Sequence, residues 1–88
     1  MKLNKLMDDF LQDYLDQNKV EFSDWSINVN NQEGFGDYSS NIALKLAKIL
    51  KKAPIEIAKS IANHPNTSEN VFTISSSEPG FVNCHISN

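Results

Sequence analysis

The sequence predicts an α+β domain in which about three helices cover one face of a small antiparallel sheet of three or four strands. Apolar residues recur with a helical period in the first and central parts of the chain, and they alternate with polar residues near residue 27 and at the end. The 88 residues suffice for one small domain and leave no room for a second. We therefore expect residues 1–88 to form a single two-layer domain with one sheet face left open.

The first helix is expected over residues 3–17, where apolar side chains follow the spacing of an amphipathic helix: Leu3, Leu6, Met7, Phe10, Leu11, Tyr14 and Leu15. From Trp25 the period changes to two, so Trp25, Ile27 and Val29 are expected to face the core from a strand. A polar turn follows, and residues 35–38 are compatible with a very short second strand.

The central helix is expected to begin right after the loop Gly34 to Gly36, with the side-chain oxygens of Asp37, Ser39 and Ser40 capping its first amides. Its inner face would carry Ile42, Leu46, Ala47, Ile49 and Leu50, and its outer face Lys45, Lys48, Lys51 and Lys52. The helix should end near Lys52, because Pro54 disfavours helical geometry in the residue before it.

A third helix should start at Pro54 and end before Pro65, with Ile57, Ala58, Ile61 and Ala62 on its inner face. Strands are then expected over residues 71–75 and 81–86, separated by a turn over residues 76–80. Strand alternation places one set of the last strand's side chains under the helices, namely Val82, Cys84 and Ile86. The other set, Phe81, Asn83 and His85, should stand on the open face.

Composition excludes several classes of function. The formal charge of −3 argues against a protein that coats nucleic acid by bulk attraction, although the lysines of the central helix could form a local patch. The single cysteine cannot form an internal disulfide, and no His, Asp or Glu pair has metal-binding spacing. No signal sequence or apolar run of the ~20 residues needed to span a bilayer is found. We expect a soluble cytoplasmic chain without catalytic residues, metal or cofactor of its own.

The Gly34-Phe35-Gly36 loop before a helix could in principle cradle a phosphate with backbone amides. Asp37 would occupy the place of the anion, and no Lys-Ser or Lys-Thr pair follows. A turn and helix cap is therefore the preferred interpretation, and a nucleotide-dependent enzyme is the disfavoured one.

Three motifs occur in a characteristic order: Gly36-Asp37-Tyr38-x-x-Asn41-x-Ala43-x-x-Leu46-Ala47-Lys48, then Pro54-x-Glu56-Ile57-Ala58, then Pro79-Gly80-Phe81-Val82-Asn83. In this order the chain resembles the additional N-terminal domain of arginyl-tRNA synthetases over nearly its whole length. The resemblance implies a domain that touches the outer corner of tRNA, where Phe81 and Asn83 would contact D-loop nucleotides. His85 is a weaker candidate neighbour, and Gly36, Asp37, Tyr38 and Asn41 are interpreted as structural.

The resemblance also implies that this chain is a fragment without activity, and that the catalytic and anticodon-binding domains of an ATP-dependent arginine–tRNA ligase lie beyond it. Its partners would be arginine-specific tRNA and the other domains of the parent, and we expect a monomer. The lysine face could bind phosphate through Lys45, Lys48 and Lys52, although a solvated helix surface is the commoner role of such residues.

From strand alternation alone, the simpler interpretation of the open face is that Phe81 covers the sheet and Asn83 is solvated. A protein-interaction domain that docks a partner on Phe81 is the alternative to tRNA binding. Salt dependence separates the two, because a contact with phosphates weakens with ionic strength far more than an apolar protein contact.

Overall fold

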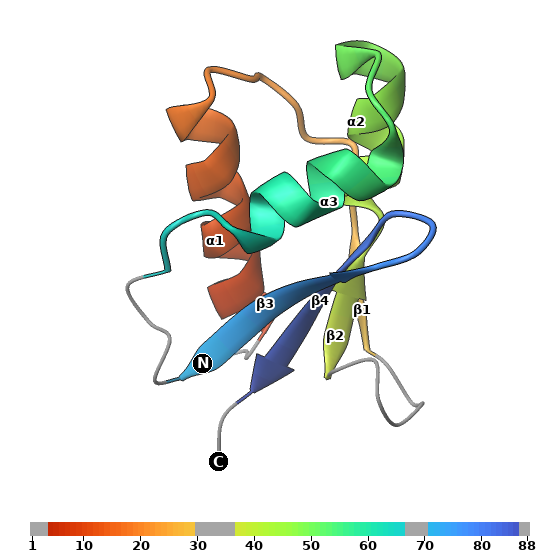
Figure 1. Cartoon of the computed structure of the whole chain (residues 1–88). Helices are drawn as coiled ribbons and strands as arrows, with labels where there is room; N and C mark the ends of the chain where they lie inside the picture. Colours follow the sequence, from red (N-terminus) through yellow and green to blue (C-terminus); the bar gives the residue numbers. More distant parts are fainter. Residues whose placement is uncertain (1–3, 30–36, 67–70, 87–88) are drawn as a thin grey trace.

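The computed structural model describes residues 4–29, 37–66 and 71–86. The elements in chain order are α1 (Asn4–Gln17), β1 (Ile27–Val29), β2 (Tyr38–Ser40), α2 (Ile42–Leu50), α3 (Pro54–Ala62), β3 (Phe72–Ser77) and β4 (Phe81–Ile86). The strands form one antiparallel sheet in the order β1-β2-β4-β3. The three helices lie on one side of this sheet (Figure 1), so the predicted α+β class and open face are confirmed.

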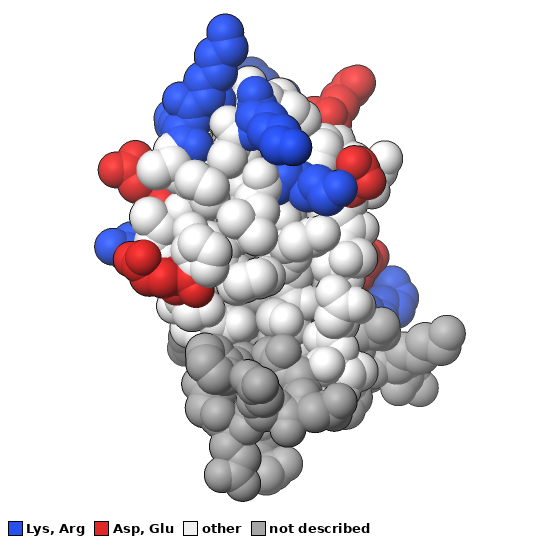
Figure 2. All heavy atoms as spheres, turned by 90° about the vertical axis from the view of Figure 1, so that its right-hand side faces the viewer, with Lys and Arg blue, Asp and Glu red and all other residues white. Residues whose placement is uncertain are grey.

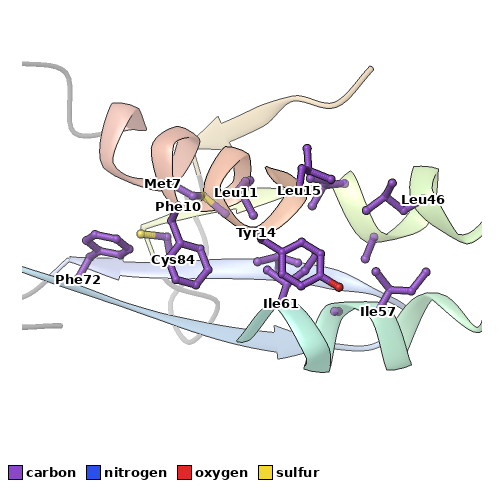
Figure 3. Packing of buried hydrophobic residues seen from close by; sticks show 14 residues of the cluster. Met7, Phe10, Leu11, Tyr14, Leu15, Leu46, Ile57, Ile61, Phe72 and Cys84 are labelled. Carbon is purple, nitrogen blue, oxygen red and sulfur yellow. The ribbon is translucent and has the colours of Figure 1, made fainter. Parts of the chain in front are cut away.

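The core lies between the sheet and the helices. The side chains of α1 point toward α3 and the strands (Figure 3), where the rings of Phe10 and Phe72 meet edge to face with centroids 6.0 Å apart. Strand β4 contributes the fully buried Val82 and Cys84, as alternation predicted. The buried cluster consists of Met7, Phe10, Leu11, Tyr14, Leu15, Ile42, Ala43, Leu46, Ile57, Ala58, Ile61, Phe72, Val82 and Cys84.

The junction between α2 and α3 holds the β3–β4 turn in place. Lys51 ends α2 in the left-handed conformation with φ 56°, and its amide donates to the carbonyl of Ala47 at 2.9 Å. Pro54 then occupies the first turn of α3, as predicted. A Cβ atom built on Gly80 would overlap the Cβ of Pro54 and lie 3.0 Å from its carbonyl carbon. The turn therefore packs directly on the start of α3, which only glycine permits at this position.

The central helix begins later than its predicted capping residues suggested. Residues 38–40 form strand β2 between β1 and β4, and α2 begins at Ile42. Of the three predicted caps, only Ser40 meets a helix amide: its Oγ accepts from the backbone N–H of Ile42 at 3.1 Å. Asp37 instead accepts from the backbone N–H of Ile86 at 2.7 Å. Pairing with β4 satisfies the backbone N–H and C=O groups of residues 38–40. This tertiary contact outweighs the local preference of the capping residues for a helix start.

Two apolar side chains expected in the core face solvent instead. Val29 is 66% exposed at the end of the edge strand β1, and Ile49 is 54% exposed. The far end of α2 rises above the rest of the molecule (Figure 1), so its last turn has nothing to pack on along that side. Periodicity shows which face of a helix is apolar, but it does not show how far the core extends along it.

The remaining boundaries agree closely with the sequence. Helices α1 and α3 and strand β4 lie where periodicity put them, and β3 extends to Ser77 where the prediction ended at Ser75. Residues 35 and 36, part of the expected short strand, lie outside the described residues. None of the helices in the described ranges is long and apolar enough to cross a bilayer.

Candidate nucleic-acid interface

The helix-free face of the sheet is a neutral, polar surface built by register. Ser39, Asn83 and Ser75 stand side by side on β2, β4 and β3, with Asn28 of β1 next in the row. On either side of this row, Phe81 pairs with Ser77 and His85 with Thr73. Directly opposite residues of antiparallel strands share a face, so these eight side chains look away from the helices. None is an acid or a lysine, and Phe81 is the one large apolar member.

Phe81 is 37% exposed and stands at the start of β4. It follows Gly80, whose close approach to Pro54 fixes the turn that precedes the ring. The ring thus follows a closely packed turn and is partly open to solvent. A flat apolar surface of this kind suits stacking by an unpaired base.

Asn83 lies on the predicted face, but it is only 4% exposed, where we expected a freely accessible amide. Its burial comes from neighbours on its own face, because it stands on an inner strand between Ser39 and Ser75 and between Phe81 and His85 along β4. Its Nδ2 donates to Ser77 Oγ at 3.0 Å. This contact joins two strands across a turn, and no pattern in the sequence predicts it.

His85 is half-buried beside Asn83, and its Nε2 lies 3.1 Å from Ser75 Oγ. Both contacts run diagonally from β4 to β3 and are parallel to each other. Asn83 contacts Ser77, the partner of Phe81 in the sheet, and His85 contacts Ser75, the partner of Asn83. Ser75 and Ser77 were not singled out from the sequence, where serines in a strand give no functional signal.

The lysines of α2 lie in two environments. Lys45 pairs with Asp24 at 3.5 Å, whereas Lys48, Lys51 and Lys52 are exposed at the far end of the helix. Figure 2 looks onto the side of the molecule that carries α2, and there the lysine side chains gather at the top above a largely uncharged surface. Lys52 is two residues from Pro54, so this basic end adjoins the turn that leads into Phe81.

Three of the four motif residues interpreted as structural lie in the described part of the chain, and each contacts another part of the fold. Asn41 Oδ1 accepts from the backbone N–H of Ser26 at 3.0 Å and so joins the segment before β1 to the start of α2. Tyr38 packs on the core from β2. Asp37 ties β2 to the end of β4, as described above. Gly36 lies outside the described residues.

The described part of the chain contains no group of three or more His, Cys, Asp and Glu that could hold a metal ion. Burial, and secondarily the charge of Asp37, raises the pKa of the Cys84 thiol to about 12, so this cysteine is an unreactive core residue. His64 Nε2 lies 2.7 Å from Asp13 Oδ2, and its ring meets Phe10 and Tyr14 edge on. These contacts fasten the end of α3 to α1.

Comparison with known proteins identifies the family. Residues 1–86 match the family described as "Arginyl tRNA synthetase N terminal domain". The arginine–tRNA ligase of Staphylococcus epidermidis is 48% identical over 54 residues, which are 60% of this chain and 10% of that protein. The ligase of Thermotoga maritima is 39% identical over 70 residues, which are 80% of this chain and 12% of that protein.

The fold is also found in a solved structure. The arginyl-tRNA synthetase of Thermus thermophilus superposes with a TM-score of 0.80 at 21% identity, over 97% of this chain and 14% of that one. The chain thus spans about a tenth of the length of the curated relatives it matches. By the match over residues 1–86, this chain belongs to the family of arginyl-tRNA synthetase N-terminal domains.

Proposed function

We propose that this domain binds tRNA through the open sheet face around Phe81 and orients it for arginylation by the catalytic part of a synthetase. The observation that carries the proposal is the partly exposed phenyl ring next to a carboxamide on a neutral face free of helices. Family membership supports tRNA as the partner, because the relatives that the chain matches are arginine–tRNA ligases.

Stacking and hydrogen bonding would share the recognition. A splayed base of the D-loop, at the outer corner of the tRNA, would lie against Phe81, and such a contact contributes about 1–3 kcal/mol per base. Asn83 would then meet the edge of the base, with His85 as a neighbour. An edge-on hydrogen bond distinguishes bases, whereas stacking alone accepts any of them.

The basic end of α2 would add attraction to phosphates. Lys48 and Lys52 are exposed, and Lys52 adjoins the turn before Phe81, so a backbone phosphate next to the stacked base could reach it. Lys45 contributes less in this scheme because it is paired with Asp24. Each phosphate contact should make binding more sensitive to salt.

The role of the domain would be positional. Contacts remote from the reaction can orient a substrate, and binding energy gained there lowers the barrier at the reacting atoms. The chemistry, with its ATP, would belong to the catalytic part of a parent arginine–tRNA ligase. In this scheme the domain has no activity or cofactor of its own and works as a monomeric module of a cytoplasmic enzyme.

A docking site for a protein is less well supported by the same face. Apolar patches mark such sites, yet Phe81 is the one large apolar side chain among the eight outward residues described above. Salt decides between the two ligands: raising the salt concentration should weaken tRNA binding steeply and leave an apolar protein contact nearly unchanged.

The proposal is tested in a synthetase chain that carries this domain. Phe81→Ala should lower kcat/KM for tRNA by about 5- to 150-fold, the equivalent of one lost stacking contact, and leave the KM values for arginine and ATP unchanged. Asn83→Ala should act in the same direction. Gln12→Ala, an exposed change on α1, is the matched control. Unchanged tRNA kinetics in both Phe81→Ala and Asn83→Ala would remove the proposed role.

A further inference from the structure

We propose that Ser77 is a positioning residue that sets the orientation of the Asn83 carboxamide and thereby the base edge that the open face can recognise. The inference rests on the proposed function and deepens it. It gives β3 a role in recognition, although none of the three sequence motifs includes this strand.

The geometry of the pair supports this role. Asn83 Nδ2 donates to Ser77 Oγ at 3.0 Å, and Asn83 is 4% exposed. A buried side chain with one fixed partner has little freedom to rotate, so the amide plane is set before any ligand arrives. Binding then costs less rotamer entropy than it would with a freely rotating asparagine.

The bond fixes the direction of the amide and leaves its carbonyl oxygen unused. One N–H of the carboxamide is donated to Ser77, and within residues 4–29, 37–66 and 71–86 the carbonyl Oδ1 of Asn83 meets no hydrogen-bond donor. Among the described residues the one enclosed side-chain polar atom without a partner is Trp25 Nε1, so Asn83 Oδ1 must reach the surface. A carbonyl oxygen accepts hydrogen bonds, and it therefore suits a base edge that presents an N–H donor.

The same arrangement occurs once more along the strand pair. Ser75 Oγ lies 3.1 Å from His85 Nε2 on the parallel diagonal, which leaves the Nδ1 side of that ring free of Ser75. Strand β3 therefore supplies two hydroxyls that hold two neighbouring polar side chains of β4. Both bonds also satisfy polar groups that are partly or fully buried, so they hold the two β4 side chains in place before any ligand is bound.

The 88-residue chain itself, labelled with ¹⁵N and ¹³C, provides the test, with an arginine-specific tRNA transcript as the probe. In Ser77→Ala the side-chain NH₂ resonances of Asn83 should move toward those of a free carboxamide, and the Kd for the transcript should rise about 3- to 10-fold, as expected for one lost hydrogen bond. Ser77→Thr keeps the hydroxyl and should restore both. Ser76→Ala removes a hydroxyl from the opposite face of β3, where it pairs with Val82, and it should change neither.

Transcript binding should also move the ¹³Cγ resonance of Asn83 downfield in the wild-type chain, because its carbonyl accepts a new hydrogen bond. The inference is overturned if the Asn83 resonances of Ser77→Ala equal those of the wild type. It is also overturned if Ser77→Thr binds as weakly as Ser77→Ala, or if Ser77→Ala leaves the Kd unchanged while Asn83→Ala raises it. If Phe81→Ala and Asn83→Ala both leave the Kd unchanged, the proposed function fails, and the inferred part in recognition fails with it.

Discussion

The chemical reactivity of Cys84 reveals which face of β4 points into the protein. Cys84 is fully buried, and strand alternation puts Phe81 and Asn83 on the other face, so an inert thiol is expected when these two side chains point away from the helices. Because the chain has a single cysteine, any labelling reports this position alone.

The expected protection follows from the pKa of the thiol, since the thiolate is the species that reacts. Burial raises the pKa of Cys84 from the ordinary 9.0 to about 12. At pH 8 a thiol with the ordinary value is about 10% ionised, whereas one with a pKa of about 12 is about 0.01% ionised, a difference of about 1000-fold. The need for the reagent to reach a buried atom slows the native reaction further.

The same raised pKa determines how the contribution of Cys84 to stability varies with pH. Between the unfolded and folded pKa values the folded chain keeps the thiol proton and the unfolded chain has lost it. The contribution of Cys84 to the free energy of unfolding is therefore fully present below pH 9.0 and is lost as the pH rises toward about 12.

The assay compares iodoacetamide alkylation in buffer and in denaturing urea at pH 8, followed by mass spectrometry. We expect the native chain to react at least about 1000-fold more slowly than the unfolded one. Thr73→Cys in a Cys84→Ala background places the thiol on the open face and should react at a rate close to that of the unfolded chain. Native and unfolded rates of Cys84 within tenfold of each other would contradict the inward orientation.

Three further predictions concern stability measured by urea unfolding. Gly80→Ala should lower the free energy of unfolding by about 1–3 kcal/mol, because its new Cβ overlaps Pro54. The loss should be smaller in a Pro54→Gly background, and equal losses in both backgrounds would show that this contact is not the cause. Asp37→Asn should cost about 1 kcal/mol by weakening the charge-assisted bond that closes the end of β4, and an unchanged midpoint would rule that bond out as a contributor. Ile61→Ala should cost about 2–5 kcal/mol, whereas Ile49→Ala should stay within about 0.5 kcal/mol; similar losses would contradict the observed extent of the core.

Much of the fold could be predicted because α1 and β4 have apolar residues at the regular spacing of a helix and of a strand. The apolar stripe of α1 and the alternation of β4 each bury one face, and that requirement leaves one orientation for the element. Pro54 marked the start of α3 for a local steric reason. Strand β2 was misassigned because residues 37–40 carry helix-capping side chains, and its true structure depends on β4, more than 40 residues later in the chain.

For the candidate site, the sequence could predict only which side chains lie on the same face of the sheet. Alternation placed Phe81, Asn83 and His85 together, and the structure bears this out. It could not show that Asn83 is enclosed by its own neighbours, since that depends on which strands flank β4. The hydroxyls of Ser75 and Ser77 were missed for the same reason, because they become partners of β4 only through the hairpin register. The contact between His64 and Asp13 joins residues 51 positions apart and likewise leaves no local signal.

Mapping tRNA onto the isolated chain by NMR tests the central claim most directly. On titration with an arginine-specific transcript, the resonances of the Phe81 ring, the Asn83 side chain and the β4 amides should shift together, and the shifts should diminish as salt is added. The outer face of α1, which carries Gln12, should stay unchanged. Shifts confined to the helices, with those of Phe81 and Asn83 unaltered at saturation, would contradict the account.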